Sequence, residues 1–233
     1  MLNNKELQLL GSSLFFEGHP IELTDALLHR SHVENFCASE TLYCAGDDPS
    51  QVYFVLEGVV QLIRGDAPHH AILSLRQPGD LVGLMANFCQ QRHHATAKSV
   101  RASKLLAIPW DALQTMTESD PAFAGRALTQ IADNTLEMVR HFERLQQLRI
   151  TERLADYLLH IAADDTGPVE LALPCDKGLI ATYLGMERES FSRALKKLRP
   201  VGVESRGRKV TLNNLGALKQ LRDSAHTIKA PAA

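Results

Sequence analysis

The chain of 233 residues has little cysteine, few aromatic residues and no long apolar run. Its four cysteines, Cys37, Cys44, Cys89 and Cys175, form no C-x-x-C pair, so neither a zinc ribbon nor a redox dithiol motif is predicted. No stretch approaches the length of apolar sequence that a transmembrane helix needs. The first residues, MLNNKELQLLGSSLFF, lack the basic start and apolar core of a secretory signal. We therefore expect a reduced, cytoplasmic setting and no membrane partner.

The sequence also lacks the short motifs that mark common enzymes. It contains no G-x-S-x-G, no H-E-x-x-H and no P-loop, and no pair of carboxylates can be assigned to a cleft. We therefore expect a protein that is not an enzyme. The length allows one large domain or two modest ones.

The net charge of the chain is small, but basic residues are concentrated in one segment. The net charge is −2, with 25 Lys and Arg against 27 Asp and Glu. Residues 187–209 hold eight basic side chains and three acidic ones, a local charge of +5, which leaves −7 for the remainder. A basic patch on an acidic protein indicates a localised contact with a polyanion.

The segment from about residue 33 to residue 108 alternates β-rich runs with turns. Runs such as QVYFVLEGVVQLIRGD and HAILSLRQPGD mix β-branched, aromatic and alternating residues, and turn signals such as Pro78-Gly79-Asp80 follow them. Many short strands at this spacing predict a β-sandwich or barrel of the jelly-roll kind, which is called the β-roll below. The predicted fold class is α+β, with a β-roll sensor domain (1–118), a dimerisation helix (119–148) and a winged helix-turn-helix (149–233).

Asp120 and Pro121 begin a long predicted helix, because a capping side chain precedes Pro in the first turn. From there a seam recurs at alternating spacings of three and four residues. The seam consists of Ala124, Leu128, Ile131, Thr135, Met138, Phe142 and Leu145. A second stripe consists of Ala132, Leu136 and Val139. We expect the seam to face a partner chain in a homodimer and the second stripe to face the β-rich domain; an ordinary buried helix is the alternative.

The basic segment follows a helix, a glycine turn and a second helix, which is typical of a helix-turn-helix. Asp176 is the predicted cap of the first helix, and Gly185 makes the turn. In the second helix one face, formed by Phe191, Ala194, Leu195 and Leu198, is predicted to be buried. The predicted DNA-binding residues are Glu189, Ser192, Arg193 and Lys196 on the other face, with Arg206, Arg208 and Lys209 on a following hairpin. Arg, Glu and Ser can bond to base edges, and Lys to phosphate; a solvated charged face is the alternative.

The order of these parts resembles the CRP/FNR family of bacterial transcription regulators over nearly the whole chain. GDLVGL (79–84) resembles the family's sensor-turn motif, and ERLADYLL resembles the start of its DNA-binding domain. LPCDKGLIATYLGMERESFSRALKKL is the most specific match. Within it, Glu189, Ser192 and Arg193 match the E-x-x-S-R of the FNR-like branch. The resemblance implies recognition of a two-fold symmetric site of the TTGAT…ATCAA type.

The resemblance also implies an effector pocket, which we assign to Gly83, Leu84, Met85, Arg92, His94 and Ala95. Members that bind cyclic nucleotides hold the ribose with Gly-Glu and the cyclic phosphate with Arg-Ser. Here Leu84 and Met85 follow Gly83 without a carboxylate, and the Arg-Ser position aligns with His94-Ala95. Arg92 would become the ligand only after a shift in register. Cyclic AMP is therefore not expected to bind.

The resemblance also implies two possible cofactors, an iron–sulfur cluster and haem. Oxygen-sensing members hold an iron–sulfur cluster with three closely spaced N-terminal cysteines and one distal cysteine. This chain has no such group, so a 4Fe-4S cluster is not expected, and buried structural cysteines are predicted instead. Haem is kept as an alternative cofactor, because members that respond to nitric oxide or carbon monoxide bind it. The candidate axial ligands are His19, His93, His94 and His141.

The predicted function is therefore a homodimeric, DNA-binding transcription regulator controlled by a signal at the β-roll. The signal is nitric oxide or redox chemistry if haem is bound, and some other effector, or none, if it is not. Double-stranded DNA is the expected partner, together with RNA polymerase if the protein is an activator. The alternative is a cyclic-nucleotide-type regulatory module that acts through a protein partner.

Overall fold

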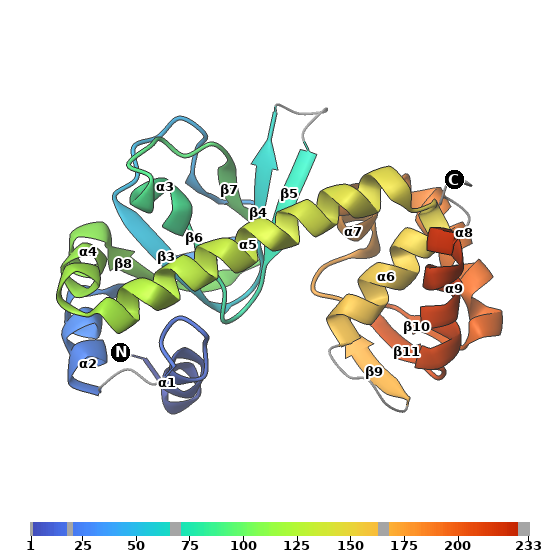
Figure 1. Ribbon diagram of the computed structural model, residues 1–233, viewed down its shortest axis with the longest axis horizontal. Helices are drawn as coiled ribbons and strands as arrows, with labels where there is room; N and C mark the ends of the chain where they lie inside the picture. The colour runs from blue at the N-terminus through green and yellow to red at the C-terminus, as the bar shows by residue number, and fades with distance from the viewer. Residues whose placement is uncertain (1, 18–20, 66–70, 163–167, 228–233) are drawn as a thin grey trace. The chain divides into compact units, whose positions relative to one another are not determined.

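The computed structural model describes residues 2–17, 21–65, 71–162 and 168–227. The chain divides into two compact units, Met1–Met138 and Val139–Ala233, and helix α5 (Pro121–Gln147) runs through the boundary (Figure 1). Within the described ranges, no helix is long and apolar enough to cross a membrane.

The first unit is built on two antiparallel sheets of four strands each. Their strand orders are β1-β8-β3-β6 and β2-β7-β4-β5, which confirms the predicted β-roll. The elements are α1 (Asn4–Gly11), α2 (Ile21–Arg30), β1 (His32–Phe36), β2 (Thr41–Tyr43), β3 (Gln51–Glu57), β4 (Val60–Arg64), β5 (Ala71–Arg76), β6 (Leu81–Val82), α3 (Leu84–Phe88), β7 (Thr96–Ser99), β8 (Ser103–Pro109) and α4 (Trp110–Ser119).

The main core of this unit fixes which face of α5 is buried. Phe123, near the start of α5, makes an edge contact with Phe15 at 4.8 Å between ring centroids. Ala127, one turn further on, is fully buried, and Ile131 packs against the same cluster. The prediction that Ala132, Leu136 and Val139 face the β-domain is therefore wrong: all three are exposed, because the phenylalanine contact turns a different stripe inward.

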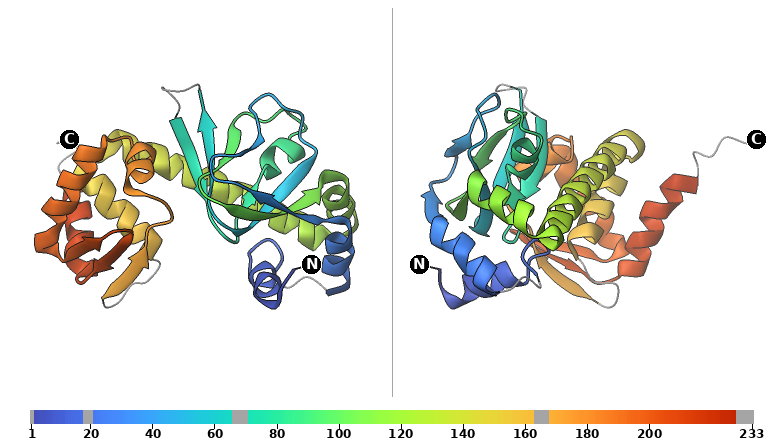
Figure 2. Two further views of the ribbon diagram at one scale, coloured as in Figure 1. Left: turned by 180° about the vertical axis from the view of Figure 1, so that it is seen from behind. Right: turned by 60° about the vertical axis from the view of Figure 1, so that its left-hand side comes forward.

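The second unit contains the C-terminal part of α5 and the elements that follow it. They are α6 (Ile150–Ala162), β9 (Val169–Ala172), α7 (Lys177–Tyr183), α8 (Arg188–Leu198), the 3₁₀ helix η1 (Arg199–Val201), β10 (Val203–Arg206), β11 (Lys209–Leu212) and α9 (Leu215–Thr227). The strands form one antiparallel sheet in the order β10-β11-β9, which lies beside the helices (Figure 2). Helix α6 packs against both α8 and α9 and is the centre of this unit.

The cysteines do not behave as the sequence predicts. Cys37, Cys44 and Cys89 are exposed, and only Cys175 of the four is buried. The prediction of buried structural cysteines is therefore wrong for three of them. Cys37 and Cys44 each follow directly after the last residue of a strand, and Cys89 follows the last residue of α3, so none lies within the β-roll core.

Candidate functional site

Helices α7 and α8 form the predicted helix-turn-helix. Asp176 caps α7: its Oδ1 accepts hydrogen bonds from the backbone N–H groups of Gly178 (2.8 Å) and Leu179 (3.0 Å). Gly185 makes the turn with φ at +61°, and a Cβ at this position would lie 3.0 Å from a methyl group of Leu145. Both the left-handed backbone and the close approach therefore favour glycine at this turn.

Helix α8 has one buried and one exposed face. Phe191, Ala194, Leu195 and Leu198 are buried against the domain, which confirms the predicted apolar face. The four predicted DNA-binding residues of this helix, Glu189, Ser192, Arg193 and Lys196, are all exposed. The spacing of three and four residues that buries the first set therefore presents the second set together to the solvent.

The exposed side chains of α8 make few hydrogen bonds, and those few stay within their own helix. The Ser192 hydroxyl donates to the carbonyl of Arg188 at 3.1 Å, and Arg193 Nη2 donates to the hydroxyl of Ser190 at 3.1 Å. Within the described part of the chain, Glu189 and Lys196 have no hydrogen-bond or ion-pair partner for their side chains. These groups are free to bond to base edges and phosphates with little loss of internal contacts.

The hairpin of β10 and β11 places three basic side chains around a tight tip. Arg206 pairs with Lys209 across the ladder, and Gly207 (φ +61°) and Arg208 form the turn. All three basic residues are exposed. Lys209 Nζ bonds to Glu170 at 2.7 Å, which raises the pKa of the lysine. Arg206 and Arg208 are therefore the freer cations of this tip.

One arginine that sequence analysis did not single out holds this module together. The Arg153 guanidinium on α6 donates to the carbonyls of Leu184 (2.6 Å), Gly185 (3.3 Å), Leu145 (3.2 Å) and Leu148 (3.1 Å). It thereby joins the end of α5 to the turn before α8. Burial lowers its pKa. Its position in an amphipathic helix gave no sign of this role, because the carbonyls of Leu184 and Gly185 lie 31 and 32 residues further along the chain.

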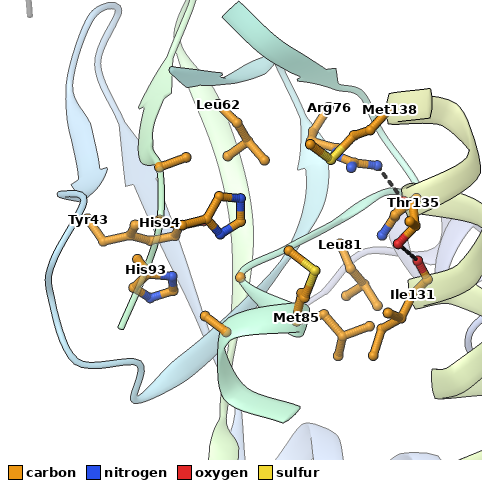
Figure 3. A pocket seen from close by; sticks show the side chains of 15 residues that line it. Tyr43, Leu62, Arg76, Leu81, Met85, His93, His94, Ile131, Thr135 and Met138 are labelled. Carbon is orange, nitrogen blue, oxygen red and sulfur yellow. Dashed lines mark hydrogen bonds between the residues drawn. The ribbon is translucent and has the colours of Figure 1, made fainter. Parts of the chain in front are cut away.

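A cavity in the first unit gathers five of the six predicted effector residues. Gly83, Leu84, Met85, His94 and Ala95 line it, and it encloses about 570 Å³ of empty space, part of it open to solvent (Figure 3). Arg92 does not line this cavity. Its side chain is exposed, donates to the carbonyl of Gly46 at 3.0 Å and pairs with Asp48 at 3.3 Å.

The cavity contains a buried arginine that sequence analysis missed. Arg76, the last residue of β5, donates from Nη1 to Oδ1 of Asn134 on α5 at 2.6 Å. Figure 3 shows its side chain beside Met138, with a dashed line to this helix. A signal was present in the sequence: Ile72, Ser74 and Arg76 occupy the inward positions of one alternating strand. That alternation predicts a strand but does not by itself give a role to its polar members.

The haem-ligand candidates are not gathered in one place. His93 and His94 both line the cavity, whereas His141 belongs to the second unit, and His19 lies outside the described residues. The His93 ring is buried and stacks on Tyr43 at 3.6 Å between centroids, and burial lowers its pKa. His141 is buried as well and stacks on Tyr183 at 4.1 Å. No group of three or more His, Cys, Asp or Glu side chains suited to a metal ion occurs among the residues that the structure describes.

The predicted dimer seam on α5 is only partly exposed. Leu128 and Phe142 are 65% and 62% exposed, and Thr135 and Met138 are also exposed. Ile131, in contrast, packs against the core of the first unit. The exposed apolar face also includes residues of the second stripe. It consists of Leu128, Leu136, Met138, Val139 and Phe142.

Comparison with known proteins agrees with this architecture. The model of the cyclic nucleotide-binding domain matches residues 33–120, and that of the Crp-like helix-turn-helix domain matches residues 152–221. The anaerobic regulatory protein of Pasteurella multocida is 26% identical over 81% of this chain and 71% of its own length. The fumarate and nitrate reduction regulatory protein of Escherichia coli is 25% identical over 90% of this chain and 84% of its own length.

A solved structure shares the fold. FixK2 from Bradyrhizobium japonicum is 24% identical, covers 87% of this chain and 99% of its own, and superposes with a TM-score of 0.71. The two family models occur in the order that the structure shows and together cover about two thirds of the chain. With its β-roll, long helix and helix-turn-helix, the chain belongs to the CRP/FNR family of DNA-binding transcription regulators.

Proposed function

We propose that the protein is a homodimer that reads a two-fold symmetric site of the TTGAT…ATCAA type. The observation that carries this proposal is the exposed face of α8, where Glu189, Ser192 and Arg193 stand together on a helix whose other face is buried. Glu accepts a hydrogen bond from cytosine, and Arg donates two to guanine. Two such helices, one per subunit, would enter successive major grooves about one helical turn apart.

The exposed apolar face of α5 supports the dimer. Isolated apolar side chains are common on protein surfaces, but a contiguous row along one helix is typical of an interface. Leu128, Leu136, Val139 and Phe142 form such a row. Packing it against the same face of a second chain would remove it from water and align the two recognition helices around a two-fold axis.

The base-reading role is tested with two arginine variants and two duplexes. Fluorescence anisotropy would compare binding of a TTGAT…ATCAA duplex with that of a shuffled duplex of equal length. We expect Arg193→Ala to lose most of the preference for the palindrome, because each bidentate pair discriminates by about 1–3 kcal/mol. Arg208→Ala should weaken binding to both duplexes alike and reduce the salt dependence, as the loss of a phosphate contact does. If Arg193→Ala binds the palindrome as tightly as the unchanged protein, the assignment of α8 as the reading helix is wrong.

The signal that controls DNA binding is proposed to act at the β-roll cavity. A ligand there would contact α5 as well as the sheets, because Ile131, Asn134, Thr135 and Met138 line the cavity. Binding would therefore shift the population between two arrangements of the helix. If the protein activates transcription, RNA polymerase would be its second macromolecular partner.

Haem is one candidate for this signal, since His94 lines the cavity (Figure 3), and a small organic effector is the other. When bound, haem would supply an iron atom for a diatomic gas. The direct test is an absorption spectrum of the protein purified without oxygen. A Soret band that is lost in His94→Ala would support haem at this cavity, and a spectrum without one would exclude haem from the purified protein.

A further inference from the structure

We propose that the β-roll cavity binds a small monocarboxylate with an apolar body, held by the guanidinium of Arg76. This inference rests on the proposed role of the cavity as the site of the signal, and it names the chemical class of the effector. It departs from the sequence-based assignment, which placed the arginine at Arg92. That side chain is exposed and paired with Asp48 instead.

The charge of Arg76 is buried without a counter-ion. Arg76 is 9% exposed, and no carboxylate in the described part of the chain lies within ion-pair distance of it. Asp80 interacts with it only at longer range. The Asp80 carboxylate accepts instead from the backbone N–H of Gln77 at 2.7 Å. Buried charges in proteins are normally paired, so a partner for Arg76 is missing.

The hydrogen bonds of Arg76 are incomplete as well. Its Nε is buried and has no hydrogen-bond partner. Nη1 donates to Oδ1 of Asn134, which also receives a bond from Gln130 at 3.4 Å. The acceptor of Asn134 is thus used twice, while its amide NH₂ makes no hydrogen bond within the described residues. Arg76 and Asn134 together offer donors that lack an acceptor, and a carboxylate has two oxygens to supply.

The other residues that line the cavity determine which ligand body can accompany the carboxylate. They are largely apolar, with Leu62, Leu81, Leu84, Met85, Ile131 and Met138 among them. A phosphate group generally needs several backbone N–H groups besides a cation. Arg76 is the one Lys or Arg side chain among the described residues of this lining, and most of the other walls are apolar, although His93 and His94 also lie there. A single carboxylate on an apolar body fits this chemistry best.

Such a ligand would act on the helix directly. The Arg76–Asn134 bond joins β5 to α5, and a carboxylate that binds the guanidinium would compete with Asn134 or bridge the two side chains. In either case the contact between the sheet and the helix changes when the site fills. The occupied and empty states of the cavity would then differ at α5, the helix that carries the proposed dimer face.

The test compares carboxylates with their own amides. Isothermal titration would measure binding of hexanoate, octanoate, benzoate and cinnamate to the full-length protein, each beside the matching amide at the same pH and salt. We expect at least one acid of the series to bind roughly tenfold or more tightly than its amide, since a charge-assisted bidentate bond is lost in the amide. Arg76→Gln should abolish this difference while the amide binds as before. Arg92→Gln is the matched control and should keep the preference.

The outcomes of these experiments separate a carboxylate-binding Arg76 from a purely structural one. If no acid of the series binds more tightly than its amide, or if Arg76→Gln keeps the preference, the proposal is overturned. A purely structural Arg76 would lower the melting temperature of the Gln variant and leave the ratio of acid to amide affinity near one throughout. Anisotropy with the TTGAT…ATCAA duplex is measured in parallel without any carboxylate. Failure of that binding would refute the proposed DNA site, whereas failure of the titration alone would refute only the ligand class.

Discussion

Arg153 allows a quantitative test of how the DNA-binding unit is held together. Its guanidinium bonds to four carbonyls that come from the end of α5 and from the turn after α7. The C-terminal ends of helices carry unpaired carbonyls and partial negative charge, and a cation there satisfies both needs. We expect Arg153→Met to release the end of α5 from the turn before the recognition helix.

The size of the effect follows from the bond lengths. The bonds to Leu184 (2.6 Å) and Leu148 (3.1 Å) are well formed, and the other two are longer. A hydrogen bond to a charged group stabilises a protein by about 1.5–3 kcal/mol, and water can replace part of it at this half-buried site. We therefore expect a loss of about 3 kcal/mol, which corresponds to a fall in melting temperature of roughly 10–20 °C for a domain of this size.

Calorimetry of the full-length chain would measure the loss, and amide hydrogen exchange would localise it to residues 176–198. Arg149→Met is the matched control, because Arg149 is exposed and its side chain makes no hydrogen bond or ion pair within the described residues. It should change stability by less than about 0.5 kcal/mol. Arg153→Lys should fall between the two, since one ammonium cannot reach four carbonyls. Equal stability of Arg153→Met and Arg149→Met would refute the reasoning.

Three further predictions concern the interface, a histidine and a glycine. Phe142→Glu should convert the proposed dimer to a monomer in light scattering, because it places a charge on the exposed apolar face; a variant that stays dimeric argues against that face. Burial lowers the pKa of His93, so the unfolded chain binds the proton more readily and stability should fall as pH drops below about 6.5. His93→Gln should flatten this loss in urea titrations between pH 7 and 5, and an unchanged slope would contradict it. Gly58→Ala should lower the free energy of unfolding by about 2 kcal/mol or more in the same assay, since φ is +101° and its Cβ would collide with the Ser103 side chain. Gly11→Ala is the control and should lower it far less, because a Cβ there meets open space. Similar losses for the two variants would be inconsistent with this account.

Much of the architecture is encoded locally and was therefore predictable. The two faces of α8 follow from a helical period that is visible in ERESFSRALKKLR, and Phe191 and Leu198 are buried as that period requires. The cap at Asp176 and the turn at Gly185 are likewise local features, since each depends on a few neighbouring residues. The charge of this segment indicated DNA when it was combined with the apolar stripe, the turn before the helix and the basic hairpin after it.

Other features depend on partners that are distant in the sequence, and only the tertiary structure decided them. The sequence shows two apolar stripes on α5, but the packing of Phe123 on Phe15 determines which stripe is buried. Arg76 and Arg92 are both arginines close to the sensor turn. The alternation of its strand marks Arg76 as an inward position, but no local feature of the sequence shows which residue it meets. The sheet turns Arg76 inward to Asn134 and leaves Arg92 outside with Asp48. The sequence by itself thus determined the elements and the DNA-facing residues that we propose, whereas the choice of the buried cation came from strand register and helix packing, which join residues far apart in the chain.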